Sequence, residues 1–280
     1  MGEFYNTSVQ ISVPAGRCMN ILHSIGKRTI KQWRSLSSVT AVICGVLLIS
    51  IKPRYWPRTV RELIVKQVLF TAIDALGMII LIAVLSGISI VTQAQVWLAK
   101  LGQSTMLGAI LVAVIIREIG PLLVNLVIIG RSGTAVATEL AGMKVRNEID
   151  VLDSQGIDPM IYLVMPRVIG MAVSVLCLTV IFSLVSLLSG YLFGMMLGVT
   201  KGEYQQFINS VTSAISPKDV ANFLAKTIIP GLTTGAICCM EGIGVQGSVT
   251  EIPQAATRGV VRSIAAVLVV SAIVSILTYT

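Results

Sequence analysis

Charged residues, cysteine and histidine are all scarce in this chain, and each scarcity excludes a class of protein. Only 12% of the 280 residues are charged and 55% are hydrophobic, which leaves too little charge to cover a soluble domain of this length. Three of the five cysteines lie in apolar segments and the total is odd, so a disulfide framework is not expected. A single histidine, His23, gives no metal-ligand cluster.

Aromatic residues are also few, at 5% of the chain. The net charge is +8, and ten of the 21 lysines and arginines precede Val68. These bases are not interleaved with aromatic side chains that could stack on nucleotides, so no nucleic-acid partner is expected. A basic N-terminal region is instead typical of the cytoplasmic side of a membrane protein.

Long apolar runs dominate what remains. Five of them are of the roughly 20 residues or more that a membrane-spanning helix needs, and they cover residues 68–96, 104–129, 160–190, 219–242 and 260–279. The sequence therefore predicts an all-α integral membrane protein whose residues 67–280 form one five-span domain.

Residues 1–66 are predicted to form a cytoplasmic tail and an interfacial or re-entrant element. Segment 17–35 mixes basic residues with apolar ones and Trp33, which favours a helix in the membrane interface over a solvated cytoplasmic helix. Segment 36–51 is apolar but too short to span, and bases flank it on both sides. We expect it to enter the inner leaflet and return.

The distribution of lysine and arginine predicts the topology. With the N-terminus inside, the inner regions hold the first ten bases together with Arg131, Lys144, Arg146, Arg167, Arg258 and Arg262. The outer regions hold Lys100, Lys201 and Lys218, with Lys226 close to that side. This bias predicts a cytoplasmic N-terminus and an outer C-terminus.

Arg117 and Glu118 lie near the middle of the predicted span 104–129. Adjacent helical residues point about 100° apart, so the two cannot stack on one another and must find partners elsewhere. Glu118 and Asn125 are seven apart and share a helix face. Pro121 loosens this helix because it has no N–H for the carbonyl of Arg117. Two interpretations stay open: a polar spot in a ligand cavity, or a structural ion pair between helices.

An acidic segment separates the second and third predicted spans. Val145, Ile149 and Leu152 form one apolar helical stripe, and the acids Glu148, Asp150 and Asp153 lie mostly off it. Gly156 is placed to end this helix, and Asp158 followed by Pro159 is a strong signal for the start of the next one. The segment is either a docking helix for a cytosolic subunit or an ordinary solvated loop helix.

These residues resemble the MlaE-type permeases of bacterial Mce-system ABC transporters. The resemblance runs from about Gln67 to the C-terminus and rests on four motifs: REIGP at 117–121, the run GRSGTAVATELAGM at 130–143, the pattern EIDxLxxxGIDP at 148–159, and Ala256-Thr257-Arg258 with Val260-Val261 before the last span. The first and third motifs contain the two features described above, the Arg117–Glu118 pair and the acidic segment.

The resemblance implies a homodimer in the bacterial inner membrane that transports phospholipid. Two copies of a cytosolic ABC ATPase would dock on it, a periplasmic Mce-domain protein, usually a hexamer, would sit on its outer face, and a small STAS-type subunit would be a further partner. The chain has no P-loop, so ATP and Mg²⁺ are expected on the ATPase, with no cofactor, metal or catalytic residue in this chain.

The resemblance also assigns residues. The lipid-binding set is Arg117, Glu118, Ile119, Asn125, Ile90, Gln93 and Trp97. The ATPase-coupling set, within a coupling helix at about 145–157 and just beyond it, is Val145, Glu148, Ile149, Asp150, Leu152, Asp153, Gly156 and Asp158. Segments 36–51 and 70–84 differ from the members that maintain outer-membrane lipid asymmetry, so the lipid and the direction of transport stay open.

Two other functions remain open on the residues alone. One is an ion-coupled secondary transporter in which Glu118 carries a proton, although no inverted repeat is evident. The other is a membrane scaffold without transport, in which Arg117 and Glu118 are only a structural pair.

Overall fold

The computed structural model describes residues 39–46, 48, 58–101, 106–196 and 204–279. The chain divides into two units, residues 1–41 and 42–280, and the account below concerns the second unit. Every regular element among the described residues is a helix, which confirms the all-α prediction. The predicted interfacial helix at 17–35 lies outside the described residues. Within segment 36–51, residues 39–46 and 48 are helical, and its re-entrant path stays a prediction.

Five helical runs in the described part of the chain are long and apolar enough to cross a membrane, as predicted. They are Thr59–Leu98, Leu107–Val145, Met160–Met196, Pro217–Ile243 and Val249–Thr278. The elements that form them are α2 (Arg58–Leu101), α3 (Leu107–Leu111), η3 (Val112–Ile119), α4 (Gly120–Ile128), η4 (Ile129–Gly133), α5 (Thr134–Val145), η5 (Met160–Val164), α7 (Met165–Met196), α9 (Pro217–Ile243), η6 (Val249–Glu251) and α10 (Ile252–Tyr279).

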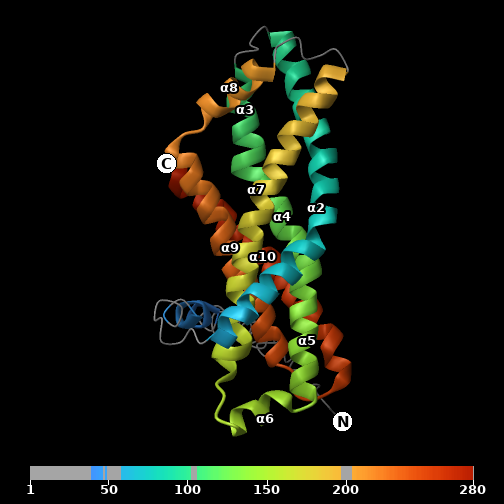
Figure 1. Ribbon diagram of the computed structural model, residues 1–280, viewed down its shortest axis with the longest axis vertical. Helices are drawn as coiled ribbons and strands as arrows, with labels where there is room; N and C mark the ends of the chain where they lie inside the picture. The colour runs from blue at the N-terminus through green and yellow to red at the C-terminus, as the bar shows by residue number, and fades with distance from the viewer. Residues whose placement is uncertain (1–38, 47, 49–57, 102–105, 197–203, 280) are drawn as a thin grey trace, which may run out of the picture. The chain divides into compact units, whose positions relative to one another are not determined.

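Two short helices lie at opposite ends of these runs (Figure 1). α6 (Glu148–Ser154) joins α5 to the third run, and α8 (Tyr204–Ala214) lies beside α3. The Tyr191 and Phe207 rings, 5.0 Å apart between centroids, link α7 to α8. We refer below to the α6 end and the α8 end of the bundle.

The second run is longer than the sequence predicted. We expected the span to stop at residue 129, but the helix continues through the π-helical turn η4 and α5 to Val145. Packing explains the difference, since Ser132 is buried and a Cβ on Gly133 would lie 3.1 Å from the sulfur of Cys238 in α9. Charged residues mark where a chain meets polar surroundings and do not mark where its helix ends.

Small residues allow the long helices to approach closely. A Cβ on Gly87 of α2 would lie 2.1 Å from the carbonyl oxygen of Ser186, and one on Gly190 of α7 would lie 2.3 Å from a methyl of Val91. Similarly, a Cβ on Gly231 of α9 would lie 2.7 Å from the Cα of Ala172. Close backbone approach at small residues is a common basis of helix association in membranes. It makes α7 the central helix, with α2 and α9 packed against it.

Candidate functional site

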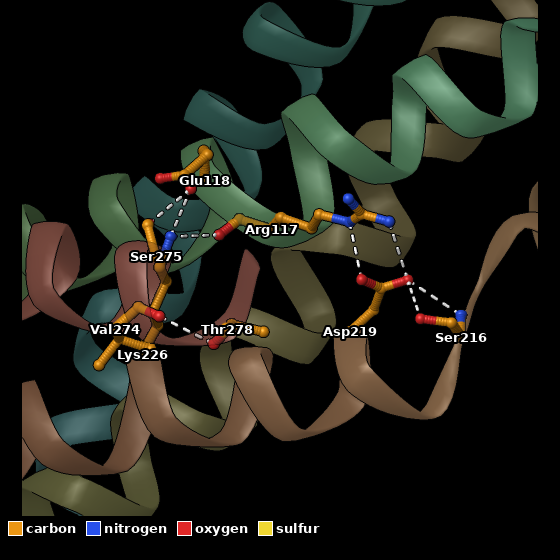
Figure 2. A network of polar contacts seen from close by, with 8 residues as sticks. All are labelled: Arg117, Glu118, Ser216, Asp219, Lys226, Val274, Ser275 and Thr278. Carbon is orange, nitrogen blue, oxygen red and sulfur yellow. Dashed lines mark hydrogen bonds and ion pairs between the residues drawn. The ribbon is translucent and has the colours of Figure 1, made fainter. Parts of the chain in front are cut away.

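The second run changes its helical geometry where it carries its charges. Over η3 the hydrogen bonds span five residues, and the N–H of Gly120 donates to the carbonyl of Ile115. Pro121 follows at once in the first turn of α4. π-Helical segments of this kind occur often at functional sites. This one carries Arg117 and Glu118 in its last turn, and their side chains point toward α9 and α10 (Figure 2).

Arg117 forms a two-point ion pair with Asp219 of α9. Its Nε lies 2.8 Å from one carboxylate oxygen, and its Nη2 donates to the other at 3.1 Å. The side chain of Asp219 is 1% exposed and also accepts hydrogen bonds of 2.9 Å from the N–H and the hydroxyl of Ser216. These last contacts cap the N-terminus of α9. One buried carboxylate therefore fixes both the guanidinium and the start of a spanning helix.

Glu118 pairs with Lys226, which lies two helical turns beyond Asp219 on α9. The Nζ of Lys226 lies 2.5 Å from a carboxylate oxygen of Glu118 and donates to the main-chain carbonyl of Arg117 at 3.0 Å. The hydroxyl of Ser275 in α10 donates to the same Glu118 oxygen at 2.9 Å. Lys226 is 1% exposed, whereas Glu118 keeps 48% of its side chain exposed. The two ion pairs therefore join the second and fourth spans, and the Ser275 hydrogen bond adds the fifth (Figure 2).

The pairing bears on both interpretations of these charges. Ion pairs between helices are present, as the structural interpretation predicted, and a buried ammonium such as that of Lys226 requires such a partner. However, Glu118 is 48% exposed and Arg117 is 28% exposed. Part of each charged group can therefore still face water or the polar group of a ligand.

Sequence reasoning missed two partners, Asp219 and Lys226. Lys226 was assigned to the outer side of the fourth span, but its side chain is buried in the bundle. A signal was available, because the two are seven residues apart in one apolar helix and so share a face, as Glu118 and Asn125 do. Two opposite charges two helical turns apart in a span predict two partners on a neighbouring span.

The level of the site also differs from the prediction. Arg117 is the eleventh of the 39 residues of Leu107–Val145, so at 1.5 Å per residue it lies about 15 Å from the start of that run and about 42 Å from its end. The run extends beyond the predicted span toward the α6 end. Arg117 therefore lies on the α8 side of the middle of the run.

The remaining predicted lipid-binding residues fall into two groups. Asn125 is buried and donates to the carbonyls of Pro121 at 2.7 Å and Lys226 at 3.4 Å, so it belongs with the charged pairs. Ile119 is half-buried at the end of η3. Ile90, Gln93 and Trp97 lie on α2, which packs along α7. Gln93 and Trp97 are exposed and Ile90 is half-buried, and their contact with lipid stays a prediction.

The predicted short helix at the other end is present as α6. Gly156, at φ +76°, ends it as predicted: its N–H donates to the carbonyl of Asp153, and the N–H of Ile157 donates to that of Leu152, which together form a Schellman motif. The carboxylate of Asp158 accepts from the N–H of Met160 at 2.8 Å and starts the next helix. Hydrogen bonds at both ends thus hold α6 between two spanning helices.

The predicted single stripe is split between two helices: Ile149 and Leu152 lie on α6, whereas Val145 is the last residue of α5, because the chain turns at Asn147, whose φ is +58°. Ile149 is buried, while Val145 and Leu152 are half-buried. Val145 packs against the buried cluster of Ala141, Val245 and Ala255. The acids face outward and two have local partners: Glu148 lies 2.5 Å from Arg146 and Asp150 lies 2.8 Å from Lys144.

Arg146 changes the acidity of Glu148. Its hydrogen bond, together with its charge, holds the pKa of Glu148 below its usual range. Asp153 is exposed on the outer side of α6, and Asp158 is exposed just after its end. Val151 of α6 is also 52% exposed, and it was not among the residues predicted to contact an ATPase.

Further ion pairs join the spans toward the α6 end. Asp74 of α2 pairs with Arg131 of η4 at 3.0 Å, and Glu139 of α5 pairs with Arg167 of α7 at 2.7 Å. Glu241 of α9 pairs with both Arg258 and Arg262 of α10. Because at least one partner of each of these pairs is substantially exposed, each contributes less than a fully buried pair.

These features define a multi-pass membrane protein with a polar site inside its helical bundle and a capped helix between its second and third spans. Residues 64–277 match the Permease MlaE family. The chain belongs to the MlaE permease family, as its motifs predicted.

Individual relatives agree with this assignment. A probable ABC transporter permease protein of Rickettsia felis is 29% identical over 90% of this chain and 95% of its own length. The intermembrane phospholipid transport system permease protein MlaE of Haemophilus influenzae is 27% identical over 89% of this chain and 94% of its own. Protein TRIGALACTOSYLDIACYLGLYCEROL 1, chloroplastic, of Arabidopsis thaliana is 27% identical over 87% of this chain and 67% of its own.

Proposed function

We propose that this chain is the membrane-spanning permease subunit of an ABC-type transporter that moves phospholipid, with ATP hydrolysed by a separate cytosolic subunit. Membership of the MlaE family and the name of the Haemophilus influenzae relative support the class. One observation carries the mechanism: a single helical run, Leu107–Val145, holds the half-exposed charges Arg117 and Glu118 and leads directly into α6.

The α6 end is the cytoplasmic end in this proposal, and α6 is the contact for the ATPase. Its exposed surface offers Val151, Asp153 and Asp158. Ile149 anchors it to the bundle from its buried side, and its two ends are held by main-chain hydrogen bonds. A displacement of α6 by the ATPase would therefore reach α5 and η5 and would not be absorbed in a loose loop.

The charged pairs provide the polar part of the lipid site. The exposed parts of Arg117 and Glu118 suit a zwitterionic or anionic headgroup, because a guanidinium binds phosphate oxygens in a forked geometry. Ile119 and the α2 residues Ile90, Gln93 and Trp97 would lie along the acyl chains. The substrate would enter at the α8 end, because the charges lie nearer that end.

We propose for this chain the assembly that its resemblance to the MlaE family implies. The chain would form a homodimer in the bacterial inner membrane, with its N-terminus cytoplasmic and its C-terminus periplasmic. It would bind two ATPase subunits, a periplasmic Mce-domain protein and a small STAS-type subunit. We expect no cofactor to bind this chain itself, and ATP and Mg²⁺ would bind the ATPase.

Reconstitution tests the proposal. The complex purified with its ATPase would be placed in vesicles, and ATP-dependent transfer of a labelled phospholipid measured. We expect transfer in the wild type and its loss, together with loss of ATPase co-purification, in the triple variant Glu148→Ala, Leu152→Ala, Asp153→Ala. A matched triple on exposed residues of α8, Asn209→Ala, Thr212→Ala, Ser213→Ala, should keep the ATPase bound. Intact docking in the α6 triple variant would refute the docking role.

The two other functions predict different results. A proton-coupled transporter would move substrate under a pH gradient without any ATPase. A scaffold would leave lipid transfer unchanged in the double variant Arg117→Ala, Glu118→Ala.

A further inference from the structure

Two prolines lie in the interior of spanning segments at neighbouring levels. Pro121 is in the first turn of α4 and Pro230 is inside α9, and both are buried. A proline has no N–H, so the carbonyl four residues before it loses its usual helical donor. These carbonyls belong to Arg117 and to Lys226. Inside a membrane protein an unpaired carbonyl is costly, because no water replaces the missing donor.

Each of these two carbonyls receives a donor from the other helix. The Nζ of Lys226, on α9, donates to the carbonyl of Arg117 at 3.0 Å (Figure 2). The Nδ2 of Asn125, on α4, lies 3.4 Å from the carbonyl of Lys226, at the long end of the hydrogen-bond range. Lys226 and Asn125 are each 1% exposed. The side chain that serves one proline break therefore comes from the helix that carries the other break.

We propose that Lys226 and Asn125 are positioning residues that couple the two proline breaks into one joint between the second and fourth spans. The parts of both helices on the α8 side of the joint carry the Arg117–Asp219 pair and move together as one body. The parts on the α6 side, α5 and the end of α9, pack against each other and form the other body. The existence of the joint does not depend on the proposed function, whereas its use in lipid transport rests on that function.

An ordinary ion pair would not require this arrangement. The ion pair with Glu118 uses one of the three N–H groups of the Lys226 ammonium, and a second is directed at the main-chain oxygen that Pro121 leaves without its helical donor. Asn125 carries no charge and still occupies the reciprocal position. This arrangement makes a specific prediction. Replacing Pro121 should restore stability only where the Lys226 side chain has been lost, and replacing Pro230 only where the Asn125 side chain has been lost.

The test measures the thermal unfolding midpoint of the full-length chain in lipid nanodiscs. Lys226→Met should lower the midpoint by about 5–15 °C, and Asn125→Leu should lower it by less. Adding Pro121→Ala, which restores a donor near the Arg117 carbonyl, should return roughly half of the loss caused by Lys226→Met. Pro230→Ala should return none of it. For Asn125→Leu, Pro230→Ala should return roughly half of the loss and Pro121→Ala should return none of it.

Two further variants keep the test decisive. Glu118→Gln removes the carboxylate charge that Lys226→Met leaves without its partner, so the same proline series in that background isolates the carbonyl contact. Lys226→Gln, which keeps a neutral donor, takes the place of Lys226→Met if the latter does not fold. If both proline replacements restore the unfolding midpoint equally, or if neither restores it, the proposed joint is refuted. Full recovery by Glu118→Gln alone would make Lys226 an ion-pair partner only.

Transport then decides whether the joint is used. We expect the variant Lys226→Met, Pro121→Ala to recover stability but to transfer lipid at least tenfold more slowly than wild type, because its second span is continuous. Wild-type transfer by this variant would overturn the role in transport. Absence of transfer by the wild-type complex would refute the proposed function, and the crossed rescue of stability would still decide the joint.

Discussion

Replacing Asp219 by asparagine removes the charge that fixes Arg117 and keeps the shape of the side chain. Asp219 is 1% exposed, and removal of one partner of a buried ion pair costs roughly 3–5 kcal/mol. Because Arg117 keeps 28% of its side chain exposed, water offsets part of this, and we expect about 2–4 kcal/mol for Asp219→Asn. Ser216→Ala removes only a capping hydroxyl and should cost about 1 kcal/mol.

A double-mutant cycle with Arg117→Met separates the pair from the cap. Unfolding free energies would be measured in mixed micelles titrated with a denaturing detergent. We expect the double variant to lose about 1–2 kcal/mol less than the sum of the single losses, since either single change already breaks the pair. Asp74→Asn, in an ion pair whose partners are both substantially exposed, is the matched control and should cost less than about 1 kcal/mol. Additivity within about 0.5 kcal/mol at Arg117 and Asp219 would refute the ion pair as a source of stability.

Three further predictions concern packing, the end of α6 and pH. Gly190→Val should destabilise the chain by more than about 3 kcal/mol, since its Cβ would lie 2.3 Å from Val91, whereas Gly77→Val meets open space and should be nearly neutral in the same unfolding assay. Gly156→Ala should cost about 1 kcal/mol because its φ is +76°, and Gly156→Asn should cost less; equal costs would contradict the left-handed requirement. The pKa of Glu148 is lowered by Arg146, so its contribution to stability is complete above the unfolded pKa and is lost as pH falls through the folded pKa. Unfolding midpoints measured from pH 7 downward should therefore fall slightly less steeply in Arg146→Ala than in the wild type, and an unchanged slope would count against the pair.

Much of the fold followed from patterns that act over short stretches of sequence. Five apolar runs predicted five spans, Gly156 predicted the end of α6, and Asp158 with Pro159 predicted the start of the next helix. These predictions succeeded because backbone hydrogen bonding in an apolar medium leaves few alternatives to a helix, and because caps depend on neighbours within a turn or two. The helix boundaries at Arg58 and Val145 were predicted poorly, since packing between helices extended them past the apolar segment.

The sequence by itself determined that Arg117 and Glu118 need partners, that Pro121 leaves the Arg117 carbonyl without a helical donor, and that the chain resembles the MlaE permeases. Only the tertiary structure decided who those partners are. Asp219, Lys226 and Ser275 are separated from the two charges by roughly a hundred residues or more along the chain. Packing of α9 against η3, α4 and α10 brings them together. The physical reason is that a cost such as a buried charge or a missing donor is local, whereas the group that offsets it can come from any helix that packs alongside.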